Sequence, residues 1–140
     1  MTDVLFLCTG NFYRSRFAEA VFNHHAEKLG IAERAISRGL AGHEGAISPY
    51  AERALAERAI EMRHTSVLPT KLTVADLESA KRVIAVHEPE HRPILAQRYP
   101  EWVDRVIYWT VSDLPLAPEV ALPMIERHVM VLMREFHSPT

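Results

Sequence analysis

The chain has 140 residues, of which 48% are hydrophobic and 24% charged, and its formal net charge is −2. This length is enough for one domain with a buried core, and the absence of a basic excess argues against nucleic acid as a partner. No apolar run is long enough to cross a bilayer, so no membrane association is expected. The first apolar run begins too close to Met1 for a signal peptide, and the single cysteine excludes an intrachain disulfide. We therefore expect a single domain over residues 1–140 in a reducing compartment, the cytoplasm.

Strands and helices are predicted to alternate, beginning with a buried strand over the apolar residues 4–7. From Ser15 to about Leu29 apolar residues recur with helical spacing, and Gly30 stands where a C-terminal cap belongs. Residues 34–40 form a weak strand candidate. These three elements give the order strand, helix, strand.

The next helices are predicted from capping signals. Ser48 and Pro49 form a cap and a first-turn proline for a helix that runs to about Ile60. Thr73 opens a capping box for a short helix to about Ala80. The remaining elements are expected to be a strand at 82–86, a helix near 93–99, a strand at 103–109 and a last helix at about 123–137. The start of the helix near 93–99 stays open, because Pro89 and Pro93 both fit a first turn.

This alternation predicts an α/β fold with a four-stranded parallel sheet and helices on both faces. In such sheets ligands bind outside the carboxyl ends of the strands. Cys8 at the end of the first strand and the loops after Val86 and Trp109 are therefore expected at one edge.

The loop between the first strand and the first helix carries the strongest chemical signal. Cys8 opens it and Arg14 closes it, with five residues between them. Backbone N–H groups at a helix N-terminus gather on an anion, and the arginine fork can hold two oxygens of a phosphate. The same donors would stabilise a thiolate. We interpret the loop as a phosphate cradle with a sulfur nucleophile. The alternative is that Cys8 is a small buried hydrophobe, which leaves Arg14 and Asn11 unexplained.

Residues 4–11 (VLFLCTGN), Arg14-Ser15 and residues 18–22 (AEAVF) resemble the signature of the low-molecular-weight protein tyrosine phosphatases. The resemblance implies a cysteine-dependent phosphomonoesterase that works through a thiophosphate on Cys8. Its substrate would be a phosphorylated protein or a small phosphomonoester, and no cofactor or metal is expected. The resemblance assigns substrate binding to the loop residues Thr9, Gly10, Asn11, Phe12, Tyr13 and Ser15.

The resemblance also implies a general acid in a late loop. Asp113 has this position and would protonate the leaving group, then act as base on water. The family acid is usually followed by proline and aromatic residues, whereas Leu114 follows here. The alternatives are that Asp113 is only a turn former, or that Asp104 is the acid.

Supporting roles follow from matching positions. Asn11 matches a residue that braces the loop in a left-handed turn, and Ser15 matches a hydroxyl that donates to the thiolate. Ser37 and His64 match positions that hold this asparagine. The alternative for these two is an ordinary strand-end hydroxyl and a partly exposed histidine.

Departures from the family pattern concern the substrate. Tyr13 replaces a common second cysteine, which excludes a protective disulfide and argues against a three-cysteine arsenate reductase. His43 replaces a frequent aromatic wall residue, so Phe12 and Tyr13 would have to supply the aromatic contacts for a phosphotyrosine ring. The sequence favours phosphomonoesterase chemistry over phosphotyrosine specificity. The alternative function is a phosphate-binding or phosphoprotein-binding module that keeps the loop but has lost turnover.

The letters H-E-x-x-H at 87–91 match a zinc motif, which requires both histidines on one helix face. Pro89 disfavours the helical region for Glu88, and the preceding run predicts a strand that ends near His87. We therefore expect no metal site here.

Overall fold

The computed structural model describes residues 2–41, 47–66, 68–112 and 117–136. One or more helices follow each strand in these ranges. The elements are β1 (Thr2–Cys8), α1 (Arg14–Leu29), β2 (Ala35–Gly39), α2 (Pro49–Glu57), the 3-10 helix η1 (Met62–His64), α3 (Val74–Ser79), β3 (Ala80–Ala85), α4 (Glu88–Arg98), β4 (Ile107–Tyr108) and α5 (Pro118–Met133).

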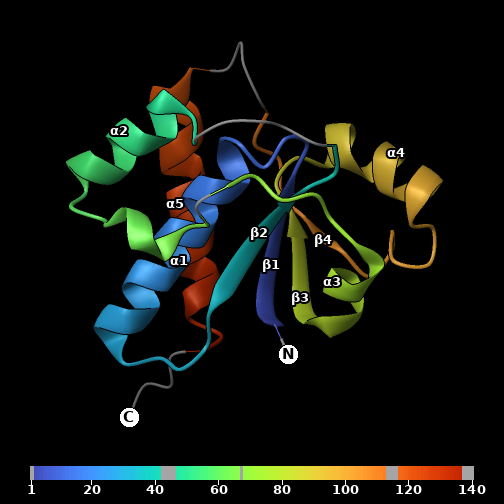
Figure 1. Cartoon of the computed structure of the whole chain (residues 1–140), viewed down its shortest axis with the longest axis horizontal. Helices are drawn as coiled ribbons and strands as arrows, with labels where there is room; N and C mark the ends of the chain where they lie inside the picture. Colours follow the sequence, from blue (N-terminus) through green and yellow to red (C-terminus); the bar gives the residue numbers. More distant parts are fainter. Residues whose placement is uncertain (1, 42–46, 67, 113–116, 137–140) are drawn as a thin grey trace.

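The four strands form one parallel sheet in the order β2-β1-β3-β4. In Figure 1, α1, α2 and α5 lie on one side of this sheet and α3 and α4 on the other. The strand order reverses between β1 and β3, which is where ligands bind in sheets of this kind. The predicted α/β fold is confirmed, with Cys8 at the carboxyl end of β1.

The core is divided by β1, whose side chains alternate between the two faces. Val4, Phe6 and Cys8 belong to the apolar cluster under α1, α2 and α5. Leu5 and Leu7 belong to the cluster under α3 and α4. All five are buried, so β1 is held from both sides and fixes the position of the loop that follows it.

The predicted helix caps are confirmed. Gly30 closes α1 in the left-handed conformation at φ 72°. The Ser48 side chain accepts a hydrogen bond from the backbone N–H of Tyr50 at the start of α2. Thr73 and Asp76 form both bonds of a capping box at the start of α3.

The largest differences from the predicted element boundaries concern β4, α4 and α5. β4 is confined to Ile107–Tyr108, because hydrogen-bonded turns occupy most of the segment before it. α4 begins at Glu88, since Pro89 fits a first turn that needs no N–H from it, and Pro93 lies inside the helix. For the same reason α5 begins at Pro118 rather than near Pro123. None of the helices in the described ranges combines the length and apolar character of a membrane span.

Candidate active site

The loop between β1 and α1, residues 8–15, is tied to its surroundings through its carbonyl groups. The carbonyl oxygens of Cys8 and Thr9 accept hydrogen bonds from the N–H groups of Leu40 and Ala41, at 2.9 and 2.7 Å. The carbonyl of Phe12 accepts one from Ser48 at the start of α2. Three acceptors of the 8–15 loop are thus bound to neighbouring segments, an arrangement that suits an anion site built from N–H donors.

Asn11 holds the 8–15 loop in a left-handed turn at φ 51°. Its Oδ1 accepts from the backbone N–H of Thr70 at 2.7 Å. Its Nδ2 donates to the hydroxyls of Ser15 and Ser37 at 3.0 and 2.9 Å. A backbone donor on one side of the amide and two hydroxyls on the other fix its orientation.

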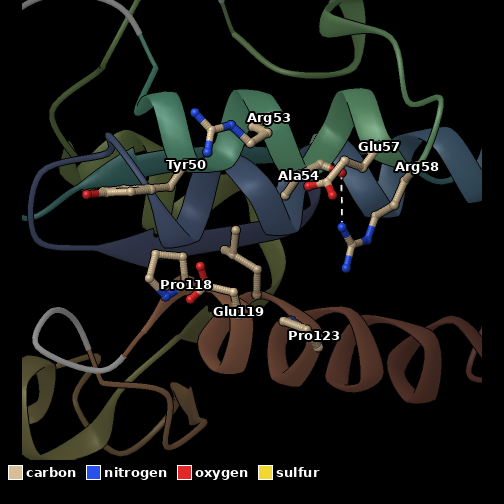
Figure 2. A pocket seen from close by; sticks show the side chains of 9 residues that line it. Tyr50, Arg53, Ala54, Glu57, Arg58, Pro118, Glu119 and Pro123 are labelled. Atoms are coloured by element: carbon tan, nitrogen blue, oxygen red, sulfur yellow. Dashed lines mark hydrogen bonds between the residues drawn. The ribbon is translucent and has the colours of Figure 1, made fainter.

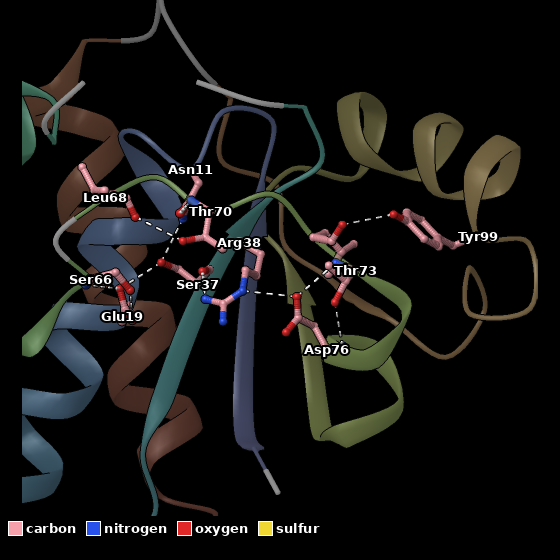
Figure 3. A network of polar contacts seen from close by, with 11 residues as sticks. Asn11, Glu19, Ser37, Arg38, Ser66, Leu68, Thr70, Thr73, Asp76 and Tyr99 are labelled. Carbon is pink, nitrogen blue, oxygen red and sulfur yellow. Dashed lines mark hydrogen bonds and ion pairs between the residues drawn. The ribbon is translucent and has the colours of Figure 1, made fainter. Parts of the chain in front are cut away.

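The hydrogen bonds around Asn11 also leave the hydrogen of the Ser15 hydroxyl available for the sulfur. Ser37 donates to Glu19 and therefore accepts from Asn11, as Figure 3 shows for this network. Ser15 likewise accepts from Asn11, and its Oγ lies 2.9 Å from Cys8 Sγ. Since the bond from Asn11 does not use the hydroxyl hydrogen, Ser15 can donate it to the sulfur.

Glu19 anchors the far end of this network from within α1. Its carboxylate accepts hydrogen bonds from Ser37, Thr65 and Ser66, and Arg16 donates to the Thr65 hydroxyl. Burial raises the pKa of Glu19, while the three donors and the nearby guanidinium of Arg16 oppose that rise. Burial also lowers the pKa of Arg16. The network therefore connects a buried carboxylate to the sulfur through hydroxyl and amide groups.

Arg14 is the first residue of α1 and is only 1% exposed. Its Nη1 donates to the carbonyl of Val111 at 2.9 Å, and its Nη2 lies 3.0 and 2.9 Å from the two oxygens of Glu90. Thr9 Oγ1 and His91 Nε2 also contact the Glu90 carboxylate. Burial by itself would raise the pKa of Glu90, but hydrogen bonds from His91, Arg14 and Thr9 hold it below its usual range.

The structure brings most of the predicted site residues together. Cys8, Asn11, Ser15 and Ser37 are joined by hydrogen bonds, and Thr9 and Arg14 meet at Glu90. Gly10 lies against Gly39 at the end of β2, where an added Cβ would stand 2.9 Å from the Gly10 carbonyl carbon. The side chains of the two residues before α1 turn toward the core: Phe12 is half-buried against it and Tyr13 is buried in it.

The structure places only one of the three remaining candidate positions. Asp113, the predicted acid, and His43 fall outside the described residues. The alternative acid Asp104 is 82% exposed, pairs with Arg92, and precedes β4 at the amino edge of the sheet. The sulfur lies at the opposite edge, so Asp104 is not placed to protonate a leaving group there.

The expected contact of His64 with Asn11 is corrected by the structure. Thr70 occupies the position of the expected partner, because its N–H donates to the Asn11 oxygen. His64 ends η1, its carbonyl accepts from Asn23, and its ring packs edge-on against His24. The chain passes Asn11 six residues later than the prediction placed it.

The two histidines of the H-E-x-x-H sequence do not share a helix face. His87 is the extended N-cap of α4, and its backbone N–H donates to Nδ1 of the buried His91 at 3.1 Å. Within the described residues, no group of three or more His, Cys, Asp or Glu side chains is arranged to hold a metal ion. The sequence prediction missed Glu90, although its position gave a usable signal. Glu90 is an acidic residue in the first turn of a helix, after a strand that ends beside Cys8.

A separate pocket of about 220 Å³ lies between α2 and α5 (Figure 2). Its wall includes Arg58, which donates to the carbonyl of Ala54 and to Glu126 and lies over the Phe17 ring. These contacts give Arg58 a role in joining the two helices.

The parallel sheet and the 8–15 loop at its carboxyl edge are the features expected of the small phosphatases whose signature the sequence resembles. The family model "Low molecular weight phosphotyrosine protein phosphatase" matches residues 3–124, and the chain belongs to this family. A protein-arginine-phosphatase of Bacillus subtilis (strain 168) is 37% identical over 105 residues, which are 74% of this chain and 67% of that protein.

Solved structures agree with this assignment. A cysteine-to-serine mutant of the arginine phosphatase YwlE, with a phosphorylated active site serine, has a TM-score of 0.82 at 26% identity over 96% of this chain and 95% of that one. A low molecular weight protein tyrosine phosphatase from T. tengcongensis has a TM-score of 0.82 at 28% identity, covering 96% of this chain and 99% of that one. The chain therefore has cysteine-based phosphatases as relatives, including one named for arginine.

Proposed function

We propose that this chain is a protein phosphatase whose nucleophile is Cys8. The sulfur attacks phosphorus, an S–P bond forms, and the bond from phosphorus to the leaving oxygen or nitrogen breaks. Arg14 and the amides of the 8–15 loop stabilise the oxygens of the transferring group. The observation that carries the proposal is the Ser15 hydroxyl 2.9 Å from Cys8 Sγ, with its hydrogen left available by the bond from Asn11.

Asp113 completes the cycle in this proposal. It protonates the leaving atom in the first step and takes a proton from water in the second. The water oxygen then attacks phosphorus, the S–P bond breaks, and inorganic phosphate leaves. The related YwlE cysteine-to-serine variant with a phosphorylated active site serine supports a covalent intermediate in this family.

Phosphoarginine is the favoured substrate. A phosphotyrosine ring needs aromatic walls, and Phe12 and Tyr13 were the side chains expected to supply them. Tyr13 is instead buried in the core at 5% exposure, and Phe12 is half-buried against it, which leaves only part of the Phe12 ring for such a contact. The relative at 37% identity is a protein-arginine-phosphatase, which agrees with a site that does not depend on stacking a ring. Phosphotyrosine is the second candidate, because the family is described by it.

The test is hydrolysis of a phosphoarginine peptide, a phosphotyrosine peptide and p-nitrophenyl phosphate by wild type, Cys8→Ser and Asp113→Asn. Wild type should have its highest kcat/KM on phosphoarginine, and Cys8→Ser should lose turnover on all three. Asp113→Asn should lose most activity where the leaving group is poor and least on p-nitrophenyl phosphate. Phosphate binding by wild type without any turnover would establish the binding-module alternative, and preference for phosphotyrosine would overturn the substrate assignment.

A further inference from the structure

We propose that Glu90 is a positioning residue that aligns Arg14 for the transferring phosphoryl group, and that its negative charge limits how tightly the 8–15 loop holds product phosphate. This inference rests on the proposed function, since it concerns how the same loop works. It starts from the two-oxygen contact between Glu90 and Arg14 Nη2, at 3.0 and 2.9 Å.

The first step concerns alignment. A guanidinium at the end of a long side chain has several rotamers, and its value as a bidentate donor depends on the orientation of its plane. In this structure Glu90 holds Nη2 while the carbonyl of Val111 holds Nη1. The two acceptors come from α4 and from the segment after β4, so they fix the plane of Arg14 from two directions.

The second step concerns what fixes Glu90 itself. It lies in the first turn of α4, and its carboxylate contacts Thr9 Oγ1 and His91 Nε2. His91 Nδ1 accepts the N–H of His87, so the neutral ring carries its proton on Nε2 and directs it at Glu90 and Thr9. Glu90 is thus held on one side by the loop it supports and on the other by its own helix.

The third step concerns charge. Glu90 sits on the guanidinium that would also hold the phosphate, so the two anions share one cation. Like charges that share one cation weaken each other's binding substantially where solvent is partly excluded, and the Glu90 side chain is only 29% exposed. The carboxylate should weaken binding of free phosphate, while transition-state binding still benefits from an aligned Arg14. Removing the charge should therefore have opposite effects on phosphate affinity and on turnover.

The decisive variant is Glu90→Gln, which keeps a hydrogen-bond acceptor but removes the charge. Inorganic phosphate should bind roughly three- to tenfold more tightly by calorimetry. The kcat should fall roughly tenfold or more, because the two-oxygen contact that aligns Arg14 is reduced to a single uncharged acceptor. Tighter phosphate binding with slower turnover is a combination that a merely structural role would not produce.

Glu88→Gln is the matched control. Glu88 lies in the same first turn, is 49% exposed and pairs with Arg92. The Glu88→Gln variant removes the same charge from a residue that has no contact with Arg14. It should leave phosphate affinity and kcat within about twofold of wild type. In an Arg14→Lys background, Glu90→Gln should lose most of its effect on phosphate affinity, since the effect acts through Arg14.

Two results would overturn the proposal: Glu90→Gln behaving like Glu88→Gln, or binding phosphate more weakly than wild type while remaining folded by circular dichroism. If Glu90→Gln does not fold, Glu90→Asp decides instead. It keeps the charge but withdraws it from Arg14, so kcat should fall while phosphate binds at least as tightly as to wild type, and an unchanged kcat would refute the alignment. The calorimetric comparison needs no turnover, so a wild type without activity would refute the proposed function while the charge effect is still measured.

Discussion

Asn11 combines two properties that seldom occur together in one residue. Its backbone is left-handed at φ 51°, and its buried side chain bonds to Ser15, Ser37 and Thr70. Asparagine tolerates this conformation better than other non-glycine residues. The backbone requirement and the hydrogen-bond requirement can therefore be separated by substitution.

Asn11→Gly and Asn11→Ala make that separation. Both lose the side-chain bonds, but only alanine adds the cost of a left-handed backbone, roughly 1–2 kcal/mol. We expect both variants to lose most turnover and Asn11→Ala to be the less stable by about that amount. Urea unfolding and p-nitrophenyl phosphate hydrolysis measure the two effects. Equal stabilities would show that the turn relaxes when the side chain is removed.

Ser15→Ala tests the direction of the hydroxyl. Without the hydrogen bond to Cys8 Sγ, negative charge on the sulfur loses a donor, and alkylation by iodoacetamide at pH 7 should slow several-fold. Alkylation is a suitable measurement because Cys8 is the only cysteine in the chain. Ser48→Ala, at the N-cap of α2, is the control and should alkylate like wild type. An unchanged rate in Ser15→Ala would contradict the assigned hydrogen-bond direction.

Glu19 gives the stability a dependence on pH. Burial is the largest effect and raises its pKa above the usual 4.5, so the folded chain keeps this proton at pH values where the unfolded chain loses it. The contribution of Glu19 to the free energy of unfolding therefore falls as pH rises from 4.5 through the folded pKa. Glu19→Gln stays neutral, so its stability relative to wild type should increase over that range in urea titrations. A difference independent of pH would contradict this account.

At the scale of elements, the end of β2 supports the 8–15 loop by close contact. A Cβ on Gly39 would stand 2.8 Å from the Ala41 oxygen and 2.9 Å from the Asn11 nitrogen, both backbone atoms. Gly30, the cap of α1, has open space but a φ of 72°. The two glycines are therefore needed for different physical reasons.

Alanine at each glycine should have different consequences. Gly39→Ala should displace the loop and lower kcat at least tenfold, since misplaced catalytic groups are costly. Gly30→Ala should cost roughly 1 kcal/mol of stability through its backbone conformation and leave kcat unchanged. Steady-state kinetics and thermal unfolding of the pair give the comparison. Full activity in Gly39→Ala would mean that the loop accommodates the extra methyl group.

Much of this element structure could be predicted from local signals. Gly30, Ser48 with Pro49, and the Thr73 capping box mark helix ends through their own backbone chemistry, and all three are confirmed. The short β4 and the helix start at Glu88 could not be predicted, because they depend on pairing with β3 and on which of two prolines fills the first turn.

The candidate site likewise has a part that could be predicted from the sequence and a part that could not. Cys8, Asn11, Arg14 and Ser15 lie within one short stretch, so their proximity could be predicted from the sequence. Thr70 and Glu90 reach that stretch only through the fold. No local sequence signal indicates that Thr70, rather than the expected His64, contacts Asn11. This contact depends on where the chain after η1 crosses the sheet edge.

At the scale of the whole molecule, one sheet carries both apolar clusters, and each cluster has one of the two tryptophans. Trp109 is buried on the α1 and α5 side, and Trp102 packs against the cluster on the α3 and α4 side. Because β1 contributes to both clusters, neither face should unfold without the other.

Trp102→Phe and Trp109→Phe each leave a single fluorescent reporter on one face. In each variant the urea midpoint by fluorescence should coincide with the midpoint by far-UV circular dichroism. Separate midpoints in either variant would show that one face opens first.

The hydrogen bonds of the 8–15 loop reach residues that are far apart along the chain. Ser37, Thr70, Glu90 and Val111 each supply one partner to Asn11 or Arg14. No early fragment of the polypeptide can contain all of these partners. After denaturation, catalysis would be among the last properties to return, and the rate of its recovery would report how fast the native structure is completed.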